Sequence, residues 1–380
     1  MLTILADENI ALVHEAFAAL GTLRTAPGRA ITPVLLDDVD ILLVRSITRV
    51  DATLLSGSRC RFVGTATSGT DHVDQAWLKE QGIAFTDAHG SNAEGVVDYV
   101  LAALALLAGR NDSDWQARSC GIIGCGAVGH RLAERVLALG MKVHVYDPFL
   151  DMSHPLAACF SSLDVVLQQD IVSLHTPLTY SGPWPTFHML DAERLALLQP
   201  DAILINAARG AVLDTPALLE RMAQAPLLRV VLDAWEGEPA VDRELLARVA
   251  IGTPHIAGYS RLGKLRGTLQ LRAALYRHLA LAAPGPLYTE EVFTMDLQQT
   301  HSETAAALLR RCILGAYDLT RDHADMQAML NVSAGQAALD FDRLRKCYPE
   351  RAEFRQFTVS CAGLHDSAIQ ALKAAGFNLA

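Results

Sequence analysis

The sequence has no net positive charge, no hydrophobic run long enough for a membrane helix and no recognisable N-terminal signal peptide. Its 380 residues carry a formal net charge of −10 at pH 7, and such a surface repels nucleic acid and anionic lipid. The most apolar stretch, residues 96–108, contains Asp98 and is too short to cross a bilayer. The N-terminal MLTILADENI has no basic region before an apolar stretch, so no signal peptide is predicted. We therefore expect a soluble cytoplasmic protein that binds neither nucleic acid nor membrane.

Paired cysteine motifs are also missing. The seven cysteines are odd in number and scattered, and no two of them form a C-x-x-C pair. This spacing argues against a zinc site or a dithiol redox motif, so we expect no bound metal. Reduced thiols in a cytoplasmic protein fit the pattern best.

The length and composition predict a globular protein of two or three domains. A chain of 380 residues exceeds what one hydrophobic core usually serves. Hydrophobic residues make up 51% and charged residues 19%, which is a folded rather than a disordered composition. Such an acidic protein binds an anionic substrate only through a local cluster of Arg, Lys or backbone amides.

Short apolar runs alternate with helical patterns through the first 255 residues. Many of these runs are rich in Val, Ile and Leu without alternation, which is typical of parallel strands buried on both faces. The segments between them are long enough for crossover helices. Residues 1–90 and 120–255 both follow this pattern, so we expect an α/β protein with two Rossmann-like, doubly wound parallel sheets. The predicted strands are 2–6, 41–44, 62–63, 83–85, 121–123, 142–146, 171–174, 202–205, 230–232 and 249–251.

Helices and a linker complete the predicted organisation. Apolar residues recur at helical spacing from Val128 to Leu139, and Gly140 follows as a C-terminal stop. Thr215 and Pro216 form an N-cap and first-turn pair. The proline- and glycine-containing stretch 282–291 is a predicted linker. A small mixed α/β module is expected after it, with a strand in FRQFTVS. Further helices are predicted at 92–108, 261–282 and 303–316.

A glycine-rich turn indicates a dinucleotide site. In GIIGCGAVG, residues Gly124, Gly126 and Gly129 form G-x-G-x-x-G between a predicted strand and a predicted helix. These glycines allow a tight turn, a close approach to a pyrophosphate and close packing of helix on strand. Asp147 ends the next strand, 18 residues after Gly129. A carboxylate there accepts hydrogen bonds from a ribose hydroxyl and repels a 2′-phosphate, which favours NAD over NADP.

Three further residues follow the ends of later strands. Arg209 comes after 202–205, Glu238 lies shortly after 230–232, and His255 follows 249–251. In a parallel sheet these positions share the carboxyl edge, where open α/β sheets bind ligands. Alone, each residue has an ordinary structural explanation, as a surface cation, a loop acid or a buried core histidine. Together they provide the groups for alcohol oxidation: a base, a carboxylate that orients it, and a cation for a substrate carboxylate.

These motifs resemble those of the D-2-hydroxyacid dehydrogenase family. The resemblance is carried by GIIGCGAVG, VYDP, INAARGAVLD, LDAWEGEP and TPHIAGYS. It implies catalytic roles for Arg209, Glu238 and His255. The cofactor contacts expected from it are Gly124, Gly126, Val128, Gly129, Asp147, Thr176, Ala207, Ala208, Asp233 and Gly258.

One branch of this family is similar over the whole chain, through ILADENI, LLVRSIT, FVGTATSGTDHVD, PHIAGYSRLGKLRGT and YPERAEF. The branch oxidises 4-phospho-D-erythronate with NAD in vitamin B6 biosynthesis. The resemblance implies a homodimer and three domains: substrate binding by 1–92 plus 258–284, NAD binding by 93–257, and dimerisation by 285–380.

The expected substrate contacts have alternatives. Arg45 and Ser46 in LVRSIT are candidate phosphate or carboxylate ligands, and Thr67 resembles a family substrate contact. Arg45 could equally form an edge salt bridge, and Tyr259 could bind a substrate oxygen or serve as a packing aromatic. Two other functions stay open. One is a dehydrogenase for another D-2-hydroxy acid, such as 3-phosphoglycerate. The other is a non-catalytic NAD-sensing protein on the same scaffold.

Overall fold

The chain folds into two compact units in a computed structural model that describes residues 2–108, 115–300 and 303–380. Unit 1 comprises Met1–Asn92 and Ser260–Glu291, and unit 2 comprises Ala93–Tyr259 and Val292–Ala380. The predicted domain ranges also include residues 1, 109–114 and 301–302, which lie outside the described residues. Among the residues described, no helix combines the length and hydropathy that a bilayer crossing needs.

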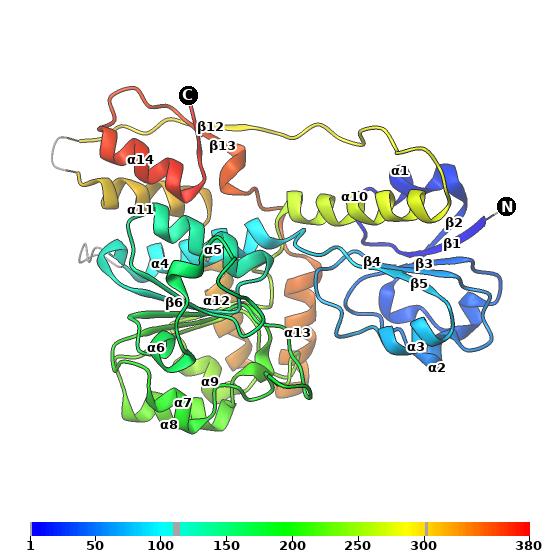
Figure 1. Cartoon of the computed structure of the whole chain (residues 1–380), viewed down its shortest axis with the longest axis horizontal. Helices are drawn as coiled ribbons and strands as arrows, with labels where there is room; N and C mark the ends of the chain where they lie inside the picture. The colour runs from blue at the N-terminus through cyan, green and yellow to red at the C-terminus, as the bar shows by residue number, and fades with distance from the viewer. Residues whose placement is uncertain (1, 109–114, 301–302) are drawn as a thin grey trace. The chain divides into compact units, whose positions relative to one another are not determined.

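Unit 1 is built on a five-stranded parallel sheet of order β2-β1-β3-β4-β5, which is a doubly wound, flavodoxin-like order. Helices α1 and α10 cover one face, and α2 and α3 lie on the other (Figure 1). The strands are β1 (Leu2–Asp7), β2 (Gly21–Ala26), β3 (Ile41–Val44), β4 (Phe62–Thr65) and β5 (Ala84–Thr86). The helices are α1 (Val13–Phe17), α2 (Ala52–Leu55), α3 (Gln75–Glu80) and α10 (Arg261–His278).

Unit 2 contains a six-stranded parallel sheet of order β11-β10-β9-β8-β6-β7. Successive residues of its strands enter different cores: Ile203 belongs to the core under α4 and α5, and Leu204 to the core on the opposite face. The strands are β6 (Cys120–Ile123), β7 (Val143–Tyr146), β8 (Ile171–Leu174), β9 (Ile203–Asn206), β10 (Arg229–Leu232) and β11 (Ile251–Gly252). The helices are α4 (Ala93–Leu107), α5 (Ala127–Ala138), α6 (Leu163–Leu167), α7 (Ala192–Ala196), α8 (Thr215–Gln224) and α9 (Arg243–Arg248).

The C-terminal segment packs into both cores of unit 2. Leu308 of α11 and Leu372 of α14 join the core under α4 and α5, while Met326 of α12 and Phe341 of α13 join the other. A parallel sheet of order β12-β13-β14 completes the segment. Its elements are β12 (Phe293–Met295), α11 (Ala305–Ala316), α12 (Thr320–Ala328), α13 (Ala334–Lys346), β13 (Phe357–Val359), α14 (Asp366–Ala375) and β14 (Asn378–Leu379).

Two helix ends test the predicted caps. Gly140, just past α5, has φ +86°, the left-handed conformation expected of a glycine that ends a helix. The predicted cap at Thr215 is wrong by one residue, because Thr215 is the first residue of α8. Asp214 is the N-cap, and its carboxylate accepts a hydrogen bond from the amide of Ala217 at 3.2 Å.

Candidate active site

The predicted site residues of unit 2 lie along the carboxyl edge of its sheet. Every strand in this sheet is parallel to its neighbours, so all of the strands end at one edge. After β7 on one side of β6, the chain crosses to β8 on the other side. Such a switch point is where doubly wound sheets bind ligands. Gly124, Asp147, Thr176, Arg209, Asp233 and His255 each follow the end of a different strand.

The glycine turn after β6 has the geometry of a dinucleotide loop. Gly124 has φ +89°, and a Cβ there would lie 2.7 Å from the carbonyl oxygen of His175. A Cβ on Gly129 would lie 1.9 Å from the Gly124 oxygen, so helix α5 approaches the turn too closely for any side chain. A Cβ on Gly126, in contrast, would meet no described atom within 4 Å. Gly126 is also the N-cap of α5 without a side-chain cap, which leaves the helix amides for an anion.

Two side chains near this turn, Asp147 and Thr176, are suited to bind parts of a dinucleotide other than its pyrophosphate. Asp147 is half-buried, and its carboxylate accepts the amides of Cys125 at 2.9 Å and Phe149 at 3.0 Å. These bonds hold the carboxylate beside the glycine turn and leave lone pairs for ribose hydroxyls. The hydroxyl of Thr176 is buried without a hydrogen-bond partner among the described residues. A buried polar atom of this kind normally has a partner, so a bound ligand would satisfy it.

The turn after β9 is shaped by a buried asparagine. Asn206 accepts the amide of Ala208 at 3.1 Å and donates to the carbonyl oxygen of Arg209 at 3.0 Å. These two bonds fix the turn in which Ala207 and Ala208 lie at the sheet edge. Arg209 follows them and is half-buried. The next residue, Gly210, packs against the backbone of Trp235. A Cβ on Gly210 would lie 1.9 Å from the carbonyl carbon of Trp235, so no larger residue fits there.

Asp233 organises the segment that carries His255. Its carboxylate is 1% exposed and accepts three hydrogen bonds, from the Thr253 hydroxyl at 2.7 Å and from the amides of Ile256 at 2.7 Å and Ala257 at 2.9 Å. Burial raises the pKa of Asp233, and the charge of His255 and the three donors oppose that rise. Asp233, predicted to contact the cofactor, thus also fixes the turn between β11 and Gly258.

Glu238 and His255 form a close pair. The Nδ1 atom of His255 lies 2.6 Å from Oε1 of Glu238, and the other carboxylate oxygen accepts the amide of Trp235 at 3.2 Å. An Nδ1–H that donates to the carboxylate leaves Nε2 unprotonated in the neutral ring. Burial alone would raise the pKa of Glu238, yet the charge and hydrogen bond of His255 and the charge of Arg345 keep it below its usual value. The Glu238 carboxylate is therefore ionised at neutral pH and fixes the orientation of the His255 ring.

Besides the predicted Arg209, Glu238 and His255, one further side chain at this site comes from the C-terminal segment. Arg345 on α13 donates to the hydroxyl of Tyr259 at 3.3 Å, and its guanidinium lies 5.9 Å from the centre of the Tyr259 ring. Burial would lower the pKa of Arg345, but the nearby Tyr259 and Glu238 raise it instead. The structure thus places a retained positive charge beside Glu238. The sequence analysis missed this residue because α13 lies about 90 positions beyond His255 and carries no motif.

Comparisons with known proteins match this architecture. Residues 108–257 match the NAD-binding domain of D-isomer specific 2-hydroxyacid dehydrogenases, and residues 288–376 match a domain family of unknown function. The erythronate-4-phosphate dehydrogenase of Stutzerimonas stutzeri is 46% identical over 99% of both chains. That of Escherichia coli O139:H28 is 43% identical over 99% of this chain and 98% of its own. The chain belongs to the erythronate-4-phosphate dehydrogenase family. Its cofactor is NAD, and its Rossmann-type fold is confirmed.

Solved structures share the fold of this family member. A protein of Thermus thermophilus aligns with a TM-score of 0.62 and 28% identity over 76% of this chain and 100% of its own. The D-lactate dehydrogenase of Aquifex aeolicus, solved with NAD and lactic acid, aligns with a TM-score of 0.57 and 24% identity over 73% of this chain and 95% of its own. These proteins match about three quarters of the chain.

The substrate contacts expected in unit 1 of this erythronate-4-phosphate dehydrogenase family member also follow parallel strands. Arg45, just after β3, forms an ion pair with the fully buried Asp7 at 3.1 Å. Ser46 is exposed beside it. Thr67, just after β4, shares a hydrogen bond with Thr65 at 2.8 Å and donates to the oxygen of Gly69 at 3.2 Å. Both alternatives for Arg45 persist, because an ion-paired guanidinium keeps further donors for an anion. These three contacts stay predictions.

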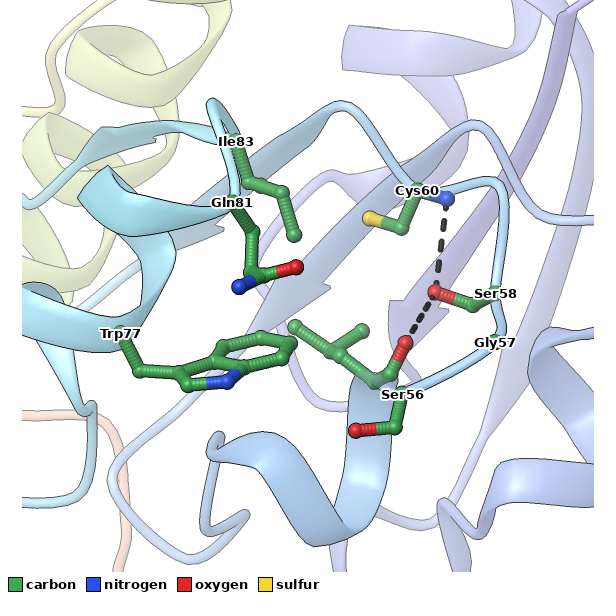
Figure 2. A pocket seen from close by; sticks show the side chains of 8 residues that line it. Ser56, Gly57, Ser58, Cys60, Trp77, Gln81 and Ile83 are labelled. Atoms are coloured by element: carbon green, nitrogen blue, oxygen red, sulfur yellow. Dashed lines mark hydrogen bonds between the residues drawn. The ribbon is translucent and has the colours of Figure 1, made fainter.

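A pocket of about 250 Å³ in unit 1 lies at the opposite edge of the sheet. Cys60 and Ile83, which line it, precede β4 and β5 rather than following them. Figure 2 shows the indole of Trp77 and the amide of Gln81 on one side and the Ser56–Ser58 turn on the other. The pocket contains none of the predicted substrate residues, so it belongs to the packing of α2 and α3.

Proposed function

We propose that this protein oxidises 4-phospho-D-erythronate to 2-oxo-3-hydroxy-4-phosphobutanoate with NAD, the reaction that its relatives' name describes. The observation that carries the proposal is the 2.6 Å contact between His255 and Glu238 on the edge that also holds the glycine turn. Membership of the family supports the substrate, since relatives at 43–46% identity over nearly the whole chain bear that name.

His255 is the proposed general base. Its Nε2 takes the proton of the C2 hydroxyl while the C2 hydrogen leaves as hydride. When bound, NAD supplies the acceptor for that hydride. Glu238 stabilises the imidazolium that forms and keeps the ring in one orientation. In the reverse direction the same imidazolium returns its proton to the carbonyl oxygen.

Arg209, Arg345 and Tyr259 are the proposed polar contacts of the substrate in unit 2. Arg209 binds the substrate carboxylate and polarises the C2 oxygen as it becomes a carbonyl. Tyr259 donates a hydrogen bond to a substrate oxygen. Arg345 adds a positive charge next to them, which suits a substrate with both a carboxylate and a phosphate better than lactate. Cofactor contacts are proposed for Gly124, Gly126, Val128, Gly129, Asp147, Thr176, Ala207, Ala208, Asp233 and Gly258.

The decisive experiment measures NADH formation by the purified protein with three substrates. We expect turnover of 4-phospho-D-erythronate and much lower kcat/KM for 3-phosphoglycerate and D-lactate. A preference for 3-phosphoglycerate would support the other dehydrogenase instead. Tight NAD binding without turnover of any of the three would support a sensing protein on the dehydrogenase scaffold.

A cytoplasmic homodimer is the proposed working form. The family-based assignment of dimerisation to 285–380 agrees with an exposed apolar strand edge in this segment. On β12, Phe293 is 40% exposed, and its neighbour Val292 is 62% exposed. The β12 strand pairs with β13 and forms one edge of its sheet, and a free apolar edge favours pairing with another chain.

A further inference from the structure

Three potential metal ligands gather beside the glycine turn. Cys125 lies within the turn, His130 lies on the first half of α5, and His154 lies in the loop after β7. Each offers one ligand atom, and these atoms all lie within 4.8 Å of one another. The three residues belong to unit 2, and none of them has a role in the proposed hydride transfer.

We propose that Cys125, His130 and His154 form a binding site for Zn²⁺ or a similar transition-metal ion. A thiolate and two imidazoles are the donors that such borderline and soft ions prefer, whereas Mg²⁺ and Ca²⁺ prefer oxygen. Tetrahedral zinc with bond lengths of about 2.0–2.3 Å needs ligand atoms about 3.3–3.8 Å apart. The present separations of up to 4.8 Å exceed this by about 1.5 Å at most, which side-chain rotation can supply. On binding, the thiol proton of Cys125 leaves to solvent.

The surroundings of the cluster support a metal ion. Glu134, one turn beyond His130 on α5, lies 3.3 Å from its Nε2 atom. Carboxylates in this position orient ligating imidazoles or complete the coordination. The rings of His154 and His130 are nearly perpendicular, with their centres 5.2 Å apart. The ring of His154 also stacks on Phe160, with the ring centres 5.5 Å apart. These contacts hold both imidazoles near the sulfur of Cys125.

The cluster is accessible from solvent on the side of its histidines. Both histidines are half-buried, so an ion reaches them from solvent, while Cys125 is 4% exposed and closes the inner side. The Nδ1 atom of His154 accepts the amide of Leu156 at 3.2 Å. Metal binding through Nδ1 of His154 would replace this hydrogen bond with a metal–ligand bond.

Titration of the full-length protein with Zn²⁺ and with Co²⁺ in metal-free buffer tests the site. We expect one tight equivalent of Zn²⁺, and Co²⁺ should give a near-ultraviolet thiolate charge-transfer band. His130→Gln and His154→Gln should each weaken Zn²⁺ binding by at least about tenfold. Cys125→Ser should abolish the Co²⁺ band.

The matched controls are His14→Gln and Cys347→Ser, which change an exposed histidine and an exposed cysteine elsewhere. Neither should alter the affinity or the band. Absence of the band in the wild-type protein with excess Co²⁺ would overturn the proposal without relying on any variant. Loss of binding in Cys347→Ser, with Cys125→Ser unchanged, would overturn it as well.

Discussion

His255 holds a backbone conformation that its residue type rarely adopts. Its φ is +56°, and a left-handed conformation in a non-glycine residue costs on the order of 1–3 kcal/mol. The Asp233 carboxylate offsets this cost, because it accepts hydrogen bonds from residues on both sides of His255. Strain of this kind persists where the surroundings fix it, and such places are often active sites.

The first prediction concerns this base. We expect His255→Asn to lower kcat by about 10²–10⁴-fold, because a positioned base contributes that much, while NAD affinity and melting temperature change little. Turnover and thermal unfolding are measured on the same purified variant. A lowered melting temperature with normal specific activity would show that His255 is a structural residue.

Glu238→Gln is the informative companion variant. It should retain more activity than His255→Asn, since the base remains. The imidazolium loses its carboxylate partner, so the acidic limb of the pH–rate profile should move to lower pH. An unchanged limb would mean that Glu238 does not act through His255.

A second prediction at this scale concerns cofactor choice. Asp147→Ala should raise the KM for NAD and narrow the preference over NADP, because the side chain beside the glycine turn no longer accepts ribose hydroxyls or repels a phosphate. Steady-state kinetics with both dinucleotides measure the ratio. Equal use of NADP by the wild-type enzyme would contradict this role of Asp147.

Motif spacing correctly predicted which candidate residues follow strand ends. The ends of β6, β7, β9, β10 and β11 bring Gly124, Asp147, Arg209, Asp233 and His255 to one edge, as expected. The Glu238–His255 contact was also predicted as a pairing of base and carboxylate. Arg345 and the Cys125 cluster were not predictable, because they depend on how distant helices and loops pack.

Among the elements, α4 carries a buried acid. Asp98 is 1% exposed and accepts the amide of Phe354 at 2.9 Å, which ties α4 to the C-terminal segment. Burial raises the pKa of Asp98 to about 8, against the opposing charge of Arg351. Between its unfolded pKa and about pH 8, the folded state therefore holds a proton that the unfolded state releases. Over this range its contribution to stability falls as pH rises.

The third prediction follows from this linkage. Asp98→Asn should remove the pH-dependent loss of stability that Asp98 causes. As pH rises from 5 to 8, the unfolding free energy of the variant should therefore increase relative to that of the wild type by up to about 1.4 kcal/mol per pH unit. Urea unfolding at several pH values measures the difference. The exposed Asp164→Asn serves as the control and should follow the wild type. A parallel shift of Asp98→Asn at all pH values would mean that Asp98 is ionised in the folded protein.

Helix α13 provides the fourth prediction. Arg345→Gln should raise the KM for 4-phospho-D-erythronate by about 10–100-fold, the loss expected for a charge-assisted hydrogen bond, and leave the KM for NAD unchanged. Arg343→Gln on the same helix is exposed and serves as the control. Equal effects of the two changes would remove Arg345 from the substrate site.

The strands show what periodicity can and cannot predict. Ile41–Val44 and Ile171–Leu174 coincide with their predicted bounds, because each is a fully buried run in which Ile, Leu and Val predominate. Strand β2 was missed, since Gly21–Ala26 is partly exposed and polar at the sheet edge. The short β12 and β14 were missed as well, because they depend on pairing with β13 rather than on their own composition.

At the scale of the whole molecule, the C-terminal segment cannot simply be removed. Its helices contribute Leu308, Phe341 and Leu372 to the two cores of unit 2. A truncation at residue 290 would therefore expose both cores and confound any test of dimerisation. A surface substitution is the better experiment.

The fifth prediction uses the exposed edge of β12. If the proposed dimer forms through this edge, Phe293→Asp should give a monomer, because a charge on an apolar strand edge opposes pairing. Sedimentation velocity measures the change. Val34→Asp alters a side chain that is 79% exposed in unit 1 and should leave the assembly unchanged. A Phe293→Asp protein of unaltered size would place the interface elsewhere.

The order of the segments also matters while the chain is being made. Unit 1 needs α10, whose Leu271 and Leu275 complete a core with Ile4 and Ile41, yet α10 leaves the ribosome nearly 190 residues after Asn92. At about 5–20 residues per second, the N-terminal sheet waits on the order of 10–40 s with one apolar face covered by α1 but not yet by α10. We therefore expect the first 92 residues to need protection by chaperones during synthesis, and slower translation would lengthen that exposure.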